Sequence, residues 1–131
     1  MASELRVNTL KDASGNNSVA TSVVASGSAK AWAMADMDVD DVFRQSFNFA
    51  SITDNGTGDY EFNFTNAMSY ADYAKGGLNG NGSKSTTSLT ANRPATPTTT
   101  SYKFTSLFTN ASSMDAYDGD DINAVIYGDL A

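Results

Sequence analysis

One short segment, residues 51–65, constrains the fold of this chain more than any other. Two extended arms flank a turn that reads Asn55-Gly56-Thr57-Gly58. Asn-Gly and the further glycine tolerate the positive φ angles that tight hairpin turns require. After the turn, aromatic and polar residues alternate with the period of two that is typical of a β-strand, which places Tyr60, Phe62 and Phe64 on one face. The segment therefore predicts a β-hairpin with one apolar side and one polar side.

Similar alternation recurs along the chain and predicts further strands. They lie at residues 4–10, 29–36, 43–49, 102–109 and 122–127. Short strands separated by frequent turns are typical of an all-β sandwich or barrel. We therefore expect an all-β fold, a small antiparallel β-sandwich or barrel. Ile52 falls out of phase with Phe49, which predicts a β-bulge near Ala50.

The segments between these strands differ in composition. Residues 12–18 are a dense cluster of turn-forming residues. The glycine-rich stretch 75–83 predicts a flexible loop or a weakened edge strand. The Ser- and Thr-rich residues 84–101 are expected to be extended and exposed, and residues 110–121 to form an acidic loop.

The N-terminal region is expected to be separate from the β-domain. Residues 19–26 fit a strand, a short helix or an extended arm, and we favour the arm. The chain then divides into an N-terminal attachment arm, residues 1–26, and a β-domain, residues 27–131. At the other end, residues 122–127 are apolar on both faces, which indicates a central strand or a subunit contact.

Large apolar side chains are scarce in this chain. Leu, Ile, Val and Phe make up about 18% of the residues, below the roughly 20% under which a highly charged chain is often disordered. The aromatic residues stand at strand spacing, however, which indicates that the domain folds. We therefore expect part of its apolar surface to be buried against other subunits.

In residues 29–36, alanine alternates with larger residues of several types. Lys30, Trp32 and Met34 share one face, and alanines occupy the other. Because alanine is small, an alanine face allows another sheet or subunit to approach closely. Strand phase also predicts core positions for three aromatic residues, Trp32, Tyr60 and Tyr102.

Composition narrows the possible functions. The formal net charge is −7, so nucleic acid and anionic membranes are poor partners. The chain contains no cysteine and no histidine, which removes the thiol nucleophile and the commonest general base. Catalysis would have to use paired carboxylates or a Ser–Lys pair, and none stands in a recognisable motif. No apolar run is long enough to span a bilayer, and the N-terminus lacks a secretory h-region. We expect no enzymatic activity and no cofactor.

Two clusters of aspartates are candidate cation ligands: Asp36, Asp38, Asp40 and Asp41 in the first, and Asp115, Asp118, Asp120 and Asp121 in the second. The first resembles the start of a calcium loop, but its sixth position is Asp41 and its twelfth is Phe47, which excludes an EF-hand. We interpret both clusters as solvated acidic turns. If they met across subunits, a bound cation would neutralise their like charges. The residues retained as candidate metal ligands are Asp36, Asp38, Asp40, Asp118 and Asp120.

Several segments resemble a known family. They are Gly27-Ser28-Ala29-Lys30-Ala31-Trp32, Arg44-Gln45-Ser46-Phe47-Asn48, the stretch from Ser51 to Tyr60, Asn63-Phe64-Thr65 and Ala67-Met68. Together they are similar to a module of tailed-bacteriophage tail-fibre and virion appendage proteins. The resemblance covers residues 4–73 well and the remainder loosely. The chain departs from the family pattern at residues 36–41, where aspartates replace a glycine turn.

The resemblance implies a non-enzymatic structural protein of the virion, usually a homotrimer, assembled in the host bacterial cytoplasm. The short chain fits a small surface appendage, such as a head fibre, a capsid decoration or a short tail appendage. Its N-terminal region would attach it to other virion proteins, with Leu5, Val7 and Leu10 as the docking residues. The alternative is a host-receptor module of a tail fibre that binds a surface glycan. For that role Tyr73 and Tyr117, which flank loops, are the expected exposed ligand contacts.

Overall fold

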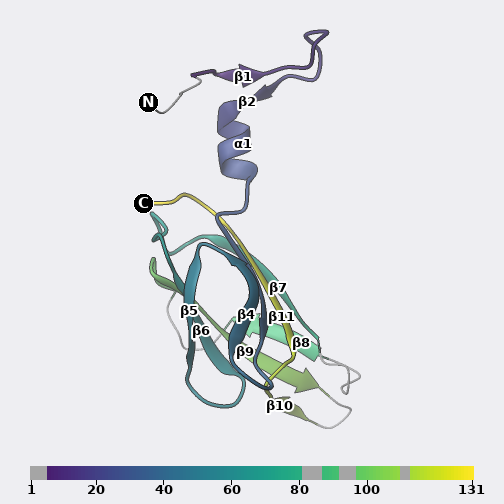
Figure 1. The fold of residues 1–131 in the computed structure, drawn as a ribbon, viewed down its shortest axis with the longest axis vertical. Helices are drawn as coiled ribbons and strands as arrows, with labels where there is room; N and C mark the ends of the chain where they lie inside the picture. The colour runs from purple at the N-terminus through teal and green to yellow at the C-terminus, as the bar shows by residue number, and fades with distance from the viewer. Residues whose placement is uncertain (1–5, 81–86, 92–96, 110–112) are drawn as a thin grey trace.

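The fold consists of two packed antiparallel sheets and an N-terminal arm that stands off one end (Figure 1). The computed structural model describes residues 6–80, 87–91, 97–109 and 113–131. The all-β prediction is confirmed, with the architecture of a sandwich. One sheet has the order β10–β9–β6–β5, with β8 also paired to β9, and comprises β5 (Phe49–Asp54), β6 (Asp59–Phe64), β8 (Thr87–Ala91), β9 (Ser101–Thr109) and β10 (Met114–Ala116). The other has the order β4–β3–β11–β7 and comprises β3 (Ala31–Asp36), β4 (Val42–Phe47), β7 (Ala74–Gly80) and β11 (Asp121–Tyr127).

The predicted hairpin is strands β5 and β6. They pair antiparallel, and Tyr60, Phe62 and Phe64 are all buried. In the turn, the positive φ angles fall on Gly56 and Gly58. The ladder shifts register between Phe49 and Ser51, which confirms the predicted bulge.

The two sheets connect at Asn48, where the sequence predicted a continuous strand over 43–49. That prediction is wrong, because β4 ends at Phe47 and β5 begins at Phe49 in the other sheet. Asn48 adopts a φ of 58°, a left-handed conformation that asparagine tolerates well. Its side-chain carbonyl accepts the backbone N–H of Asn66 at 2.8 Å, and its amide donates to the Asn66 carbonyl at 3.1 Å. These bonds hold the corner at which the chain changes sheets.

The core is built from large side chains on one sheet and small ones on the other. The five-stranded sheet supplies a layer of packed rings, in which Phe62 lies 4.8 Å from Phe104 and 5.4 Å from Phe49 between ring centroids. The four-stranded sheet faces these rings mainly with buried alanines and two isoleucines: Ala31, Ala33, Ala35, Ala124, Ile122 and Ile126. The alanine face of β3 therefore admits the aromatic layer at close range.

Strands also form in the three segments for which the sequence predicted a loop or edge strand, an extended tract and an acidic loop. Residues 75–80 of the glycine-rich stretch belong to β7, an edge strand, which was one of the two predicted alternatives, and residues 81–83 lie outside the described residues. Part of the Ser- and Thr-rich tract pairs with β9 as β8, and the predicted acidic loop contains the short strand β10. Strand β11 lies between β3 and β7, which confirms the first of its two predicted alternatives, a central strand.

The arm is folded rather than extended. It contains β1 (Thr9–Leu10), β2 (Val19–Ala20) and the helix α1 (Thr21–Gly27), and the predicted turn at 12–18 joins the two strands. The strand predicted over residues 4–10 is thus only two residues long within the described part of the chain. The Lys30 ammonium donates to the carbonyls of Ala25 and Ser28, and so satisfies acceptors at the end of α1. No side chain of α1 is buried.

Candidate functional site

The outer face of the four-stranded sheet is the most unusual surface of this protein. It carries Trp32, Met34, Phe47, Leu78, Val125 and Tyr127, and we call this set the outer face. Trp32 lies directly opposite Phe47 on one side and Val125 on the other. Leu78 is 75% exposed, Phe47 50% and Trp32 41%. A sheet face with its large apolar residues in solvent is typical of an interaction surface.

The exposure of Trp32 corrects its predicted place in the core. The alternation in β3 is as expected, but the buried side is the alanine side. Rings from β6 and β9 already fill the space between the sheets, so β3 has room only for methyl groups there. Strand phase alone cannot show which of two faces is turned inward.

An open groove of about 470 Å³ runs along β11 on the outer face. Its floor is formed by Val125 and Asn123, and Trp32 and Leu78 stand on opposite sides. Gly76 lies directly opposite Val125 and has no side chain to cover it. A Cβ at Gly76 would meet the nearest atom, Val125 Cγ1, at 3.6 Å, an ordinary contact. The glycine at this position of β7 therefore leaves Val125 uncovered on that side of the groove.

The second sheet has the opposite character on its outward side. Glu61, Asn63, Lys103 and Thr105 alternate there with the buried rings. The Asn63 amide donates to Thr53 Oγ1 at 2.9 Å and to Ser51 Oγ at 3.1 Å. This surface is polar and internally hydrogen-bonded, as expected for a sheet face that contacts water.

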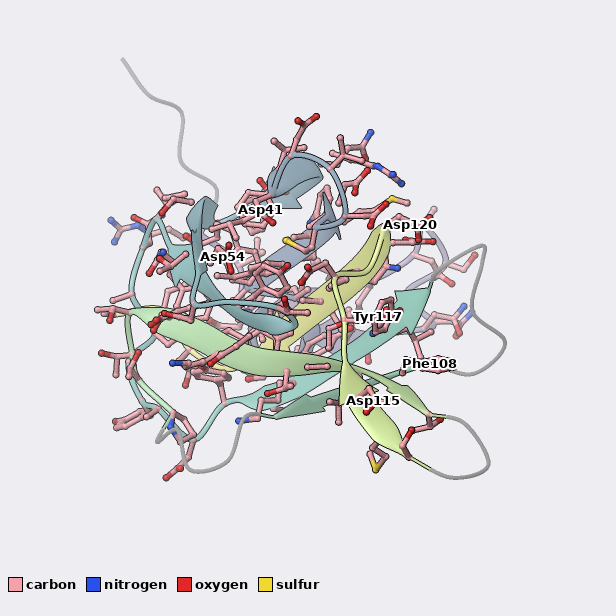
Figure 2. The ribbon with its side chains drawn as sticks, turned by 90° about the horizontal axis from the view of Figure 1, so that it is seen from below. Asp41, Asp54, Phe108, Asp115, Tyr117 and Asp120 are labelled. Carbon is pink, nitrogen blue, oxygen red and sulfur yellow. The ribbon has the colours of Figure 1, made fainter. Side chains whose placement is uncertain are left out.

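Parts of the two aspartate clusters meet within one chain, at the end of the sandwich opposite the arm, whereas Asp115 lies apart from them in β10 (Figure 2). Figure 2 views this end and shows Asp41 near Asp54, with Asp120 and Tyr117 across from them. The loops are joined by a hydrogen bond from the Met37 backbone N–H to the Gly119 carbonyl, at 2.8 Å. Burial raises the pKa of Asp41, and the carboxylates of Asp54, Asp118 and Asp40 raise it further. We call this region the acidic end. It comprises Asp36, Asp38, Asp40, Asp41, Asp54, Asp118 and Asp120.

Two carboxylates of the acidic end, those of Asp36 and Asp118, accept hydrogen bonds from other side chains of the protein. Asp36 accepts a hydrogen bond from Arg44 at 2.6 Å, which lowers the pKa of Asp36. Asp118 accepts from the Gly58 backbone N–H and the Tyr60 hydroxyl, while Asp38 and Asp40 are exposed. Asp120 Oδ1 is buried with no hydrogen-bond partner among the described residues. Among the residues that the structure describes, no three acidic side chains lie close enough together to hold a metal ion.

Tyr73 and Tyr117 are buried, which corrects their expected exposure. The Tyr73 hydroxyl donates to the Ser101 carbonyl at 2.8 Å, and burial raises its pKa to about 12. The Tyr117 hydroxyl donates to Asn79, whose amide in turn donates to Ser106 Oγ at 2.7 Å. Both rings come from loops but turn inward and cover the margins of the core.

The predicted docking residues of the arm lie in solvent where the structure describes them. Val7 and Leu10 are exposed, as are Val23 and Val24 of α1. Leu5 lies outside the described residues. Docking through the arm remains a prediction.

The comparisons with known proteins add no assignment. No protein-family model, no curated protein and no solved structure matches this chain. Within the described ranges, no helix has the length and apolar character needed to cross a membrane.

Proposed function

We propose that this chain is a non-enzymatic structural protein of a bacteriophage virion, a small homo-oligomeric appendage or decoration protein attached by its N-terminal arm. The observation that supports this best is the outer face of the four-stranded sheet. A chain with few large apolar residues leaves several of them, including Trp32, Phe47 and Leu78, in solvent. Such an arrangement costs solubility unless another surface covers it, and assembly supplies that surface.

The shape of the protein supports attachment by the arm. Figure 1 shows α1 and the β1–β2 pair projecting from one end of the sandwich, away from β10 and the turns at the other end. The arm carries exposed apolar residues and buries none of α1 against the domain. A partner that bound the arm would leave the sheets free to contact other copies. The trimeric order is what the family resemblance implies.

The alternative function, a glycan-binding receptor module, has weaker support. Tyr70 is 72% exposed and Trp32 41%, so both rings could stack on a sugar. Glycan sites, however, also need several convergent hydrogen-bonding groups. The described residues that line the groove beside Trp32 are mainly glycine and apolar residues, and Asn123 is the one amide among them. The outer face is therefore better suited to a protein surface than to a sugar.

Localisation on purified phage particles tests the proposal. We expect the protein to copurify with particles of the phage that encodes it. Deletion of residues 1–26 is expected to release the folded domain from the particle. Particles that lack the protein should rupture more readily if it decorates the capsid, whereas loss of host adsorption with intact particles would favour the receptor role. Absence of the protein from purified particles would contradict both.

A further inference from the structure

We infer that the outer face joins this chain to a second copy of itself, with Leu78 of one copy filling the groove beside Gly76 of its neighbour. The inference rests on the proposed function, because it names the partner of the surface that supports that function.

The lack of charged residues among the described residues of the groove favours an uncharged partner. The chain has a net charge of −7, yet none of the described residues that line the groove is charged. A basic partner would be attracted to the acidic end rather than to this face. A surface that matches the groove must be apolar and neutral at its centre, and the outer face of another copy meets both requirements.

Shape makes the face complementary to itself. Leu78 and Gly76 are two residues apart on the same side of β7, about 7 Å along the strand. Leu78 projects into solvent, whereas the position of Gly76 is an open notch over Val125. A single face therefore presents both the projection and the recess that a contact between copies needs. Contact in either a dimer or a ring can use such a pair.

The backbone at position 76 does not require a glycine, so the open space there indicates a contact with another chain. The φ of Gly76 is not in the left-handed region, and its Cβ position is free of close contacts. Neither the turn chemistry nor the packing inside the chain therefore requires glycine here. Glycine in a strand interior weakens the strand. Its presence is accounted for if another chain fills the space.

Sedimentation equilibrium of the full chain tests the inference, with wild type compared with Leu78→Asp and Gly76→Ala. Wild type is expected to associate. Leu78→Asp should weaken association about tenfold or more, since it places a charge in an apolar contact. Gly76→Ala should weaken it by a smaller factor because it partly fills the notch.

Matched controls separate association from charge and folding. Tyr70→Asp makes the same charge change at a residue that does not line the groove, and Gly27→Ala adds a methyl group in α1 where no atom lies within 4 Å. Both should associate like wild type, and circular dichroism should show all four variants folded.

Two results would overturn the inference. If wild type associates but Leu78→Asp and Gly76→Ala do so equally well, copies join elsewhere and the proposed virion function still stands. If wild type is a monomer at every concentration, the outer face has another occupant, and the particle experiment decides independently whether the virion function survives.

Discussion

The two sheets of this protein use the same alternation with opposite outcomes. On β6 and β9 the aromatic residues point inward and the polar residues face water. On β3 the alanines point inward, and Trp32 and Met34 point outward. The five-stranded sheet thus buries its aromatic side chains within one chain. Strand β3 of the four-stranded sheet has its small residues in the core and its large ones in solvent, and this outward side is the one that we propose a second copy covers.

This difference explains how a chain poor in large apolar residues builds a core. Methyl groups on one layer leave space for rings on the other, so one set of aromatic side chains fills the interior between both sheets. The remaining large residues are then free for the outer face. Substitutions on the two sheets should therefore have very different effects on the isolated chain.

The largest effect is expected in the ring layer. Phe62 is fully buried and packs against Phe43, Phe49 and Phe104. Phe62→Ala should lower the free energy of unfolding by about 3–5 kcal/mol. Phe47→Ala, at a half-exposed ring of the outer face, should lower it by about 1 kcal/mol or less. Urea unfolding of dilute protein measures both, and equal losses would remove the distinction between the sheets.

A slightly smaller effect should follow from enlarging one of the buried alanines of β3. Ala33 is 4% exposed and faces the rings. Ala33→Leu should lower the free energy of unfolding by about 3 kcal/mol, because the added carbons have no space. Met34→Leu, one residue along on the outward side, should cost less than about 1.5 kcal/mol. Thermal and urea unfolding compare the two, and a harmless Ala33→Leu would show that the interior is loosely packed.

The polar link between the sheets should rank next. Asn79 on β7 donates to Ser106 on β9 and accepts the Tyr117 hydroxyl, all in the buried interior. Asn79→Ala should cost about 2 kcal/mol, since it removes hydrogen bonds from buried groups. Asn63→Ala, on the solvent side of β6, should cost about 0.5 kcal/mol, because water replaces its partners. If the two variants were equally stable in urea, the link would have no structural role.

The smallest effect concerns the acidic end. The pKa of Asp41 is raised in the folded state, so its ionisation opposes folding at neutral pH. Asp41→Asn should raise the free energy of unfolding by up to about 0.5 kcal/mol at pH 7, a modest gain because the group is largely exposed. The gain should vanish below the ordinary carboxyl pKa of 3.8, where both folded and unfolded chains are protonated. Unfolding measured from pH 3 to pH 7 tests this, with the exposed Asp72→Asn as control; a gain that persists in acid would contradict the electrostatic cause.

Much of the fold could be predicted from local pattern. The hairpin and the bulge after Phe49 follow from alternation and turn residues, and the central position of β11 follows from its two apolar faces. The corner at Asn48 could not be found in this way, because a left-handed asparagine inside an apparently continuous strand leaves no periodic signal. Strand β10 was missed because it is only three residues long and its pairing with β9 is a tertiary contact.

The candidate site was only partly predictable. The sequence shows that β3 has an alanine side and a side with Trp32, but the choice of inward side depends on rings contributed by other strands. Leu78 and Gly76 gave no signal of their own, since they lie in a glycine-rich stretch that also fits a loop. Tyr73 and Tyr117 flank loops in sequence, yet their rings turn back into the core through hydrogen bonds to distant residues.

The fluorescence of Trp32 over a range of protein concentrations tests the central claim most directly. It is the single tryptophan of the chain, and it stands on the outer face beside the groove. If copies cover this face, its emission should shift to shorter wavelength as concentration rises, and Leu78→Asp should retain the long-wavelength emission of dilute protein. An emission maximum that stays at long wavelength while sedimentation shows assembly would contradict the claim, because the copies would then meet through some other surface.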